Sequence, residues 1–287
     1  MIDHAAVYRS LLPIEIEVMK GIENGMKTHE WVPVESIVSY TGLNQKEVEF
    51  RLKKLSKQEL IEWLTLSYTG YRLKFNGYDI LAINTFVKKD TIEALGNVIG
   101  VGKESVIIAA MSVTGEVAIK FHREGRTSFK QVKRTREHLI NIEHYSWQYA
   151  AKLAANREFE AMQKLYPEVR IPQPIDYNRH AIVMSIVDGA DLVRAQVADP
   201  EWYLDEILKQ VKIAYDLGYI HGDLSEYNVM VSDKGITIID WPQYVTVGSK
   251  TAESLLNRDI SNILTYFERK YRVTRDLEET IKSIKGE

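Results

Sequence analysis

The chain has 287 residues, of which 45% are hydrophobic and 27% charged, and its formal net charge is -3. This composition is ordinary for a globular protein, and the length allows two domains. The absence of cysteine excludes disulfide scaffolds, thiolate zinc sites and cysteine nucleophiles. No stretch approaches the roughly eighteen uninterrupted apolar residues of a transmembrane helix, so we expect a cytoplasmic protein without a membrane anchor.

Two helices are predicted early in the chain, over residues 34–40 and 45–57. The second of these carries apolar residues at helical spacing, namely Val48, Leu52 and Leu55. Asn44 is a suitable N-cap for it, and Glu47 stands three residues later as a capping-box partner. The short segment between the helices makes them a helix-turn-helix unit.

Strands are predicted over residues 60–66 and 71–75, with a turn around Thr69-Gly70. A further helix over 78–88 would follow. Two helices and a β-hairpin wing in this order predict a winged-helix domain over residues 1–90.

The second helix of this domain is strongly basic, with Lys46, Arg51, Lys53, Lys54 and Lys57. A recognition helix contacts nucleic-acid phosphates with such side chains. Glu47 and Glu49 interrupt the patch, and a charged outer face is also the ordinary solvent side of an amphipathic helix. The sequence leaves a nucleic-acid surface and a solvated face equally open.

A glycine-punctuated segment begins the second half of the chain. Gly100 and Gly102 precede one apolar run, and a strand over 116–121 then contains Lys120. Glycines let backbone amides approach phosphates, and a lysine on the following strand pairs with nucleotide phosphates in kinase-like sites. Glycines at a plain hairpin bend are the alternative for the first feature alone.

A basic segment over residues 122–147, which includes Arg126 and Lys130, has too few apolar residues to pack a core. We expect it to be mobile or to become ordered only with a ligand or partner. The helix predicted after it, over 146–165, carries Glu158 where a partner for Lys120 is expected. An apolar strand then precedes Asp188-Gly189 and is predicted to cross between two lobes, and residues on it that could contact an adenine are Met184, Ser185 and Val187.

The most informative run begins at His221-Gly222-Asp223 and continues to Asn228. Two apolar runs follow and predict a hairpin that turns at Asp233-Lys234-Gly235, which would bring Asn228 and Asp240 to the same end. A phosphoryl-transfer site needs one carboxylate near the attacking oxygen and oxygen ligands for magnesium. Asp223, Asn228 and Asp240 fit these three roles.

The motifs together resemble a known family. His221-Gly222-Asp223, Asn228 and Ile239-Asp240 resemble the kinase-like phosphotransferases in general. Gly100-Val101-Gly102-Lys103-Glu104-Ser105 and the segment 125–133 resemble the RIO family of atypical protein kinases, in the subfamily with an N-terminal winged helix. The resemblance covers essentially the whole chain.

This resemblance implies an α+β fold in which the winged-helix domain precedes a compact, bilobal, protein-kinase-like domain. That domain would span 91–287, with an N-lobe over 91–186 and a C-lobe over 187–287. It would lack the activation loop and the peptide-binding subdomains, because only about 45 residues follow Pro242.

The resemblance also implies ATP and Mg²⁺ (or Mn²⁺) as cofactors and assigns roles to residues. Asp223 would be the catalytic aspartate, and Asn228 and Asp240 the metal ligands, with Asp240 also a possible acceptor of the phosphoryl group. Lys120 would bind phosphate and pair with Glu158. The nucleotide loop would comprise Gly100, Gly102, Lys103, Glu104 and Ser105.

Members of the family are implicated in maturation of the small ribosomal subunit, and some act chiefly as ATPases. The resemblance therefore implies autophosphorylation and a precursor of the small subunit, through its rRNA or its proteins, as the partner. Residues that could contact nucleic acid or such a partner are Lys46, Arg51, Lys53, Lys54, Arg126 and Lys130.

Asp240-Trp241-Pro242 replaces the Asp-Phe-Gly of ordinary protein kinases, and proline lacks the conformational freedom of that glycine. Gly222 replaces the arginine that grips a phosphorylated activation loop. Two alternatives stay open from the residues. His-Gly-Asp and Ile-Asp-Trp also occur in small-molecule phosphotransferases of the aminoglycoside or choline kinase type, and the winged helix could belong to a nucleic-acid-binding protein with an inactive kinase fold.

Overall fold

A computed structural model describes residues 2–65, 67–123 and 147–287. The chain divides into two compact units. The first comprises Met1–Leu153 with Asp176–Ile182, and the second comprises Ala154–Ile175 with Val183–Glu287. Of the helices in the described ranges, none combines the length and the hydrophobicity needed to cross a bilayer.

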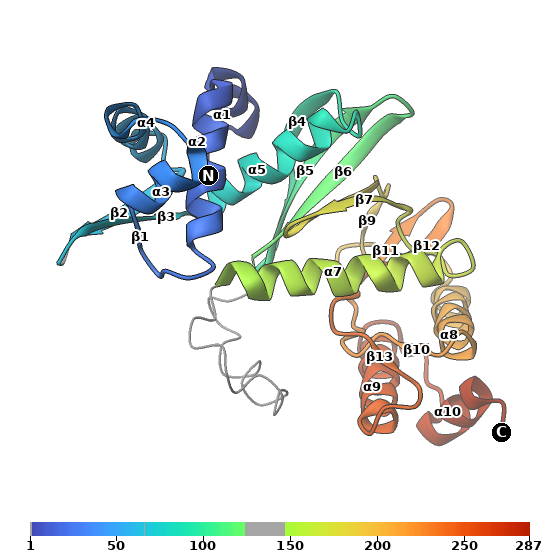
Figure 1. Ribbon diagram of the computed structural model, residues 1–287. Helices are drawn as coiled ribbons and strands as arrows, with labels where there is room; N and C mark the ends of the chain where they lie inside the picture. The colour runs from blue at the N-terminus through green and yellow to red at the C-terminus, as the bar shows by residue number, and fades with distance from the viewer. Residues whose placement is uncertain (1, 66, 124–146) are drawn as a thin grey trace. The chain divides into compact units, whose positions relative to one another are not determined.

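The first unit begins with a helical domain that carries a small sheet (Figure 1). Its helices are α1 (His4–Ser10), α2 (Pro13–Gly25), α3 (Val34–Thr41) and α4 (Gln45–Lys57). Its strands are β1 (Val32–Pro33), β2 (Ile61–Thr65) and β3 (Thr69–Leu73), in the order β1-β3-β2. Helix α2 packs against both α3 and α4. The predicted helix-turn-helix and β-hairpin are therefore present.

Helix α4 has the predicted bounds because its local signals agree with its packing. Asn44 caps it, and the Asn44 side chain accepts the Glu47 N–H at 3.0 Å. The Glu47 carboxylate pairs with Arg51 at 2.6 Å instead of completing a capping box. The predicted apolar face is fully buried.

The turn of the wing was predicted wrongly. Thr65 pairs with Thr69, so the connection lies between these two residues, and Gly70 is inside β3. A Cβ atom on Gly70 would lie 2.5 Å from the Cβ of Trp31. This glycine therefore allows Trp31 to approach the strand closely. In the sequence alone, a glycine with this role looks the same as a glycine in a turn.

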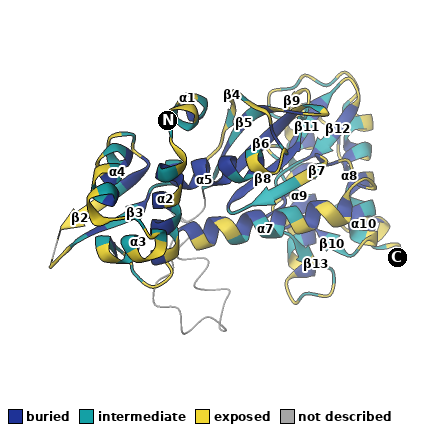
Figure 2. Ribbon diagram, turned by 45° about the horizontal axis from the view of Figure 1, so that its top comes forward, coloured by how far each residue is buried: buried dark blue, intermediate teal, exposed yellow. Residues whose placement is uncertain are grey.

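Helix α5 (Phe75–Lys88) follows the wing and is buried over most of its length, as its dark colour in Figure 2 shows. Apolar residues on several of its faces pack into the unit, and Asp79 among them has no exposed surface. A helix that is hydrophobic nearly all round is a core helix. Its buried carboxylate requires partners, which come from three other segments.

A five-stranded sheet follows, in the order β4-β5-β6-β8-β7, and this unit holds all of β4, β5 and β6. The strands are β4 (Ala94–Val101), β5 (Ser105–Ser112), β6 (Gly115–His122), β7 (Pro174–Asn178) and β8 (Ala181–Ser185). On β5, Val106, Ile108 and Ala110 face the core, whereas the alternate residues are partly open. The two faces of β5 thus differ in their exposure.

The second unit holds most of α7 (Trp147–Leu165) and the C-terminal part of the chain. Its other helices are α8 (Pro200–Asp216), α9 (Ala252–Tyr271) and α10 (Leu277–Lys285). Its short strands are β9 (Ala190–Asp191), β10 (Tyr219–Ile220), β11 (Val229–Ser232), β12 (Gly235–Ile238) and β13 (Val245–Thr246). Helices α8, α9 and α10 pack against one another and support the loops between the strands.

Candidate active site

The hairpin of β11 and β12 brings two of the predicted site residues together. Val229 pairs with Ile238, and the Ile239 N–H donates to the Asn228 carbonyl at 3.0 Å. Asn228 and Asp240 consequently flank the same end of the hairpin, as the sequence predicted. The other end turns at 233–234, so Asp233 lies at the opposite end of the hairpin from Asp240.

Asp223 is joined to this end of the hairpin through its backbone. The Asn228 side-chain amide donates from Nδ2 to the Asp223 carbonyl at 2.9 Å. This bond fixes the orientation of the amide and leaves its Oδ1 as an acceptor. The Asp223 side chain is 65% exposed, so its carboxylate is accessible to a substrate. Asp223, Asn228 and Asp240 are thus grouped by short backbone connections.

Gly222 is required immediately before the candidate catalytic aspartate. Its φ is +79°, a left-handed conformation that favours glycine. A Cβ atom at this position would lie 2.5 Å from the Gln243 carbonyl oxygen. The residue that replaces the kinase arginine therefore lets two segments of backbone approach closely.

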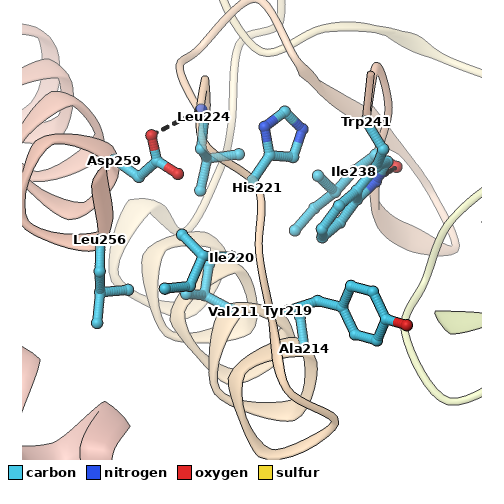
Figure 3. Close-up of a pocket in the computed structure, with 10 residues that line it drawn as sticks. All are labelled: Val211, Ala214, Tyr219, Ile220, His221, Leu224, Ile238, Trp241, Leu256 and Asp259. Carbon is cyan, nitrogen blue, oxygen red and sulfur yellow. Dashed lines mark hydrogen bonds between the residues drawn. The ribbon is translucent and has the colours of Figure 1, made fainter. Parts of the chain in front are cut away.

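Side chains of helix α9 hold the loop around Asp223, and Figure 3 shows the bond between Asp259 and Leu224. The Asp259 carboxylate accepts the Gly222 N–H at 2.7 Å and the Leu224 N–H at 3.1 Å. Asn262 donates to the Leu224 carbonyl at 3.1 Å. Arg258 donates to the Gly222 carbonyl and approaches the Asp223 carboxylate to 3.8 Å. Three side chains of one helix therefore fix the backbone on both sides of Asp223.

The Asp259 carboxyl is 1% exposed, and burial raises its pKa to about 6. The two backbone N–H donors and Arg258 act in the opposite direction, because they stabilise the ionised form. Burial is the larger effect. The carboxyl is ionised at neutral pH, and protonation at mildly acidic pH would remove one of its two acceptors for the loop.

His221 is a neutral structural residue of the same loop. Burial lowers its pKa, against the opposing effect of the Ile239 carbonyl and nearby carboxylates. Its Nε2 lies 3.0 Å from the Ile239 carbonyl oxygen, and its Nδ1 lies 3.3 Å from the Asp223 nitrogen. The carbonyl can only accept and the backbone N–H can only donate, so the proton resides on Nε2. His221 thereby links the segment before Asp223 to the segment before Asp240.

Asp240 has a left-handed backbone conformation, with φ of +71°. Aspartate tolerates this region better than most residues. Trp241, next in the chain, is 2% exposed, its backbone N–H donates to Glu158 at 3.2 Å, and its indole N–H donates to the Ile238 carbonyl at 3.4 Å. The tryptophan that replaces the kinase phenylalanine is therefore held inside the unit by both of its donors.

Helix α7 supplies a second restraint on this segment. Arg157 donates to the Pro242 carbonyl at 3.2 Å and to the Tyr244 carbonyl at 2.6 Å, and its guanidinium lies 4.9 Å from the Tyr244 ring centroid. Arg157 and Glu158 thus bind consecutive parts of the segment that follows Asp240. The predicted pairing of Glu158 with Lys120 stays a prediction.

In the first unit, the predicted nucleotide loop is the connection between β4 and β5. The Gly102 N–H donates to the Ser105 carbonyl at 2.9 Å and closes the turn. Lys103 at its tip is exposed, and Glu104 and Ser105 are partly exposed. A Cβ atom on Gly102 would lie 3.3 Å from the Ser105 Oγ, so a side chain there would crowd that hydroxyl.

Lys120 lies on β6, which pairs with the strand that follows this loop, and it is only 5% exposed. It pairs with Ile107, which in turn pairs with Gly100, so the three residues form one row across the strands. Residues directly opposite each other project to the same face. The structure therefore aligns the predicted lysine with the first glycine of the loop.

The predicted adenine contacts follow β8. Met184 is buried, whereas Ser185 and Val187 are partly exposed. The Ser185 N–H donates to the Gln173 carbonyl at 3.0 Å, and the Ser185 Oγ accepts the Gln173 N–H at 2.9 Å. The neighbouring segment therefore uses the Ser185 N–H, and the contact of these three residues with an adenine stays a prediction.

Two cations of the basic helix α4 have a partner inside the domain. Buried Glu15 accepts Lys54 at 2.8 Å and Arg51 at 3.4 Å, so both cations neutralise the domain's own carboxylate. Lys46 and Lys53 are exposed on the outer side of the helix. The predicted contacts Arg126 and Lys130 lie outside the described residues.

Comparisons with known proteins agree with this geometry. A family model of the RIO domain matches residues 105–280, and a model described as Rio2, N-terminal, matches residues 8–89. The chain is 43% identical over 265 residues to the RIO-type serine/threonine-protein kinase Rio2 of Methanocaldococcus jannaschii, covering 88% of this chain and 96% of that protein. The chain belongs to the RIO kinase family, in its Rio2 branch.

Eukaryotic members of the branch are more distant and longer. The chain is 34% identical over 278 residues to the serine/threonine-protein kinase RIO2 of Saccharomyces cerevisiae, covering 92% of this chain and 65% of that protein. The similar kinase of Dictyostelium discoideum is 37% identical over 267 residues, covering 92% of this chain but 51% of that protein. The chain thus spans between half and two thirds of these two relatives.

A solved structure of the Rio2 branch has the same fold. The Rio2 kinase of Chaetomium thermophilum, described as an ADP/Mg²⁺-phosphoaspartate complex, gives a TM-score of 0.82 at 32% identity, covering 97% of this chain and 88% of that one. The predicted α+β fold, with a winged helix before a kinase-like domain, is confirmed. The chain is accordingly an enzyme of the protein kinase class.

Several residues of this RIO kinase site were not identified from its sequence, namely Arg157, Arg258, Asp259 and Asn262. Asp259 was detectable, because it stands directly before Ile260 on a helix whose Leu256 and Ile263 mark the buried face. An acidic residue on such a face must have a specific partner. The other three lie on polar positions of helices, where the pattern carries no such signal.

The cavity beside these residues is not a substrate pocket. It is lined by apolar side chains of α8, α9 and β12 together with His221, Trp241 and Asp259 (Figure 3). Its volume of about 10 Å³ is room for a single water molecule. It is a small internal cavity beside the loop that carries Asp223.

Proposed function

We propose that this RIO kinase is an ATP- and Mg²⁺-dependent phosphotransferase that passes through an aspartyl-phosphate at Asp240. The observation that carries the proposal is the grouping of Asp223, Asn228 and Asp240 at one end of the β11–β12 hairpin. The similar Rio2 structure, whose description includes a phosphoaspartate, supports it.

The donor set at this end of the hairpin fits magnesium. Mg²⁺ prefers oxygen ligands, and Asn228 keeps its Oδ1 available because its Nδ2 is already used. Asn228 and Asp240 would hold the ion, which neutralises phosphate charge when it is bound. Lys120 and the loop at Ser105 would bind phosphate oxygens.

In the proposed reaction, a carboxylate oxygen of Asp240 attacks the γ-phosphorus of ATP. The bond between that phosphorus and the β–γ bridging oxygen breaks, and ADP leaves with the bonding electrons. Water then cleaves the aspartyl-phosphate, which returns the Asp240 carboxylate and releases inorganic phosphate. Asp223 orients the attacking water or a protein hydroxyl and accepts its proton.

ATP turnover by wild type and three variants tests this assignment. Asp223→Ala and Asp240→Ala should each lower turnover by at least about two orders of magnitude. Asp233→Ala is the matched control, because Asp233 is an exposed aspartate at the other end of the same hairpin. Wild-type turnover in both site variants would show that the site is wrongly assigned.

The intermediate has its own test. Aspartyl-phosphate is an acyl phosphate, so hydroxylamine should release the label transferred from γ-labelled ATP, whereas phosphoserine and phosphothreonine resist it. Label that survives hydroxylamine in wild type, or hydroxylamine-labile label in Asp240→Asn, would contradict the proposed intermediate.

We also propose RNA as the partner of the winged-helix domain, and the small ribosomal subunit precursor as its source. Lys46, Phe50, Lys53 and Lys57 are all exposed on α4, at spacings of four, three and four residues. This spacing places them on one face of the helix. Three lysines around an exposed aromatic ring suit phosphates and an unstacked base.

Salt dependence of RNA binding tests this surface. Replacing Lys46, Lys53 and Lys57 together by alanine should lower the slope of log affinity against log salt by about 2 to 3. Lys54→Ala is the contrast, because Lys54 is paired with Glu15 and should leave the slope nearly unchanged. An unchanged slope in the triple variant would exclude this face. Preference for small-subunit over large-subunit rRNA fragments tests the source.

A further inference from the structure

A buried charged cluster joins the winged-helix domain to the nucleotide loop within the first unit. Its centre is Asp79 on α5, whose side chain has no exposed surface. Arg123, directly after β6, donates to both carboxylate oxygens, at 2.6 Å and 2.5 Å. A bidentate pair between guanidinium and carboxylate fixes orientation as well as distance.

Two histidines complete the coordination of this carboxylate. The Nε2 atoms of His4 on α1 and His180 in the turn after β7 each lie 2.8 Å from one of its oxygens. Burial lowers the pKa of His180 to about 4, so this ring is a neutral donor. Burial acts to raise the pKa of Asp79, but Arg123 and the two histidines lower it below its ordinary value. Asp79 is therefore ionised and fully paired.

The cluster is not a metal centre. Within the described ranges, no group of three or more His, Asp or Glu side chains is placed to hold a metal ion. Phe75 and Phe121 flank the guanidinium of Arg123, with ring centroids at 4.8 Å and 5.9 Å. Aromatic packing on a buried ion pair restricts the motion of Arg123.

The backbone of the same arginine holds the nucleotide loop. The Arg123 N–H donates to the Glu104 carbonyl at 2.7 Å, and the preceding residue, His122, pairs with Ser105 across the strands. The Glu104–Ser105 end of the loop thus depends on where Arg123 is held. Its side chain is held by α5.

We propose that Arg123, anchored by Asp79, is a positioning residue that lets the winged-helix domain set the conformation of the nucleotide loop. The ion pair connects the last helix of that domain to the backbone that precedes Ser105. A contiguous chain of buried contacts of this kind can carry a coupling of about 5- to 150-fold in affinity. The inference rests on the proposed binding of ATP at this loop.

The test compares Asp79→Asn and Arg123→Lys with a matched control, Asp176→Asn. Asp176 accepts Lys89 at 2.9 Å and Thr91 at 2.8 Å, so it also ties the end of α5 to the sheet, but it has no contact with the loop. The first two variants should raise the KM for ATP about tenfold with little change in kcat. Hydrogen exchange at residues 100–106 should quicken in both, and neither effect should occur in Asp176→Asn.

A double variant separates positioning from simple stability. Asp79→Asn with Arg123→Met removes both charges, leaves no unpaired buried ion and keeps an amide oxygen as an acceptor beside His4 and His180. We expect thermal stability to recover toward wild type while the KM for ATP stays raised. Recovery of both thermal stability and the KM for ATP would show that the ion pair acts only through stability, and it would overturn the proposal.

An unchanged KM for ATP and unchanged hydrogen exchange at residues 100–106 in Asp79→Asn and Arg123→Lys would also overturn the proposal. Failure of the proposed function is distinguishable, because wild type itself would then bind no ATP by calorimetry.

Discussion

Asp259→Asn should weaken catalysis without weakening the fold. The carboxylate accepts N–H groups on both sides of Asp223, at 2.7 Å and 3.1 Å. An asparagine in its place offers one oxygen and one NH₂ group, so one of these N–H groups faces another donor. The loop then loses a hydrogen bond to a charged group, which is worth about 1.5 to 3 kcal/mol. If the lost hydrogen-bond energy raises the activation barrier by displacing Asp223, turnover should drop about 10- to 100-fold.

At neutral pH, Asp259→Asn should leave the free energy of unfolding unchanged or raise it, although the same substitution lowers turnover. Burial raises the pKa of Asp259 to about 6 from the ordinary 3.8. A raised acid pKa means that the folded state favours the protonated form, so this carboxyl contributes stability below pH 3.8 that is lost as pH rises through about 6. The difference corresponds to at most about 3 kcal/mol. Because asparagine does not ionise, the variant should match wild type near pH 4 and be equally stable or more stable at pH 8.

Urea unfolding at pH 4.5 and pH 8, with ATP turnover between pH 5 and 8, measures both effects. Wild-type turnover should rise with an apparent pKa near 6, and this titration should be absent in Asp259→Asn. A variant that loses stability at pH 8 in parallel with activity would refute the reasoning, because the ionised carboxylate would then stabilise the fold.

Three further changes test the supports of the site. Gly222→Ala should lower turnover at least about tenfold and destabilise the protein by about 1 to 3 kcal/mol, because its Cβ would lie 2.5 Å from the Gln243 carbonyl oxygen. Turnover assays and urea unfolding measure the two effects, and wild-type values in both would contradict this prediction. Arg157→Ala should quicken hydrogen exchange at residues 241–244 and lower turnover, because its hydrogen bonds to two carbonyls of that segment are lost. Unchanged exchange would show that Arg157 does not hold this segment. Glu15→Gln should destabilise the first unit by about 1 to 3 kcal/mol, because Lys54 loses a buried partner, with little effect on turnover at a permissive temperature.

Local signals predicted the parts of the fold that local physics decides. The Asn44 cap and the apolar spacing fixed the bounds of α4, and two apolar runs around a glycine turn predicted the hairpin that pairs Val229 with Ile238. The candidate metal ligands were accessible to sequence reasoning for the same reason, because Asn228 and Asp240 are adjacent to those strands.

Features that depend on distant segments were not predictable in this way. Gly70 has the residue type of a turn but serves the close approach of Trp31, which lies 39 positions earlier. Arg51 and Lys54 have the composition of a nucleic-acid surface, but buried Glu15 on another helix takes both. Tertiary ion pairs leave no periodic trace in the sequence, and only the three-dimensional arrangement separates these two cations from exposed Lys53.

Trp241 gives this RIO kinase an internal optical probe. Ordinary protein kinases carry phenylalanine there, whereas this chain has a fully enclosed indole next to Asp240, with its ring centroid 4.5 Å from that of His221. Emission from so enclosed an indole lies at shorter wavelength than emission from exposed Trp63 or Trp202. If Asp240 accepts the phosphoryl group as proposed, the emission of Trp241 offers an intrinsic signal for that step in the unlabelled protein.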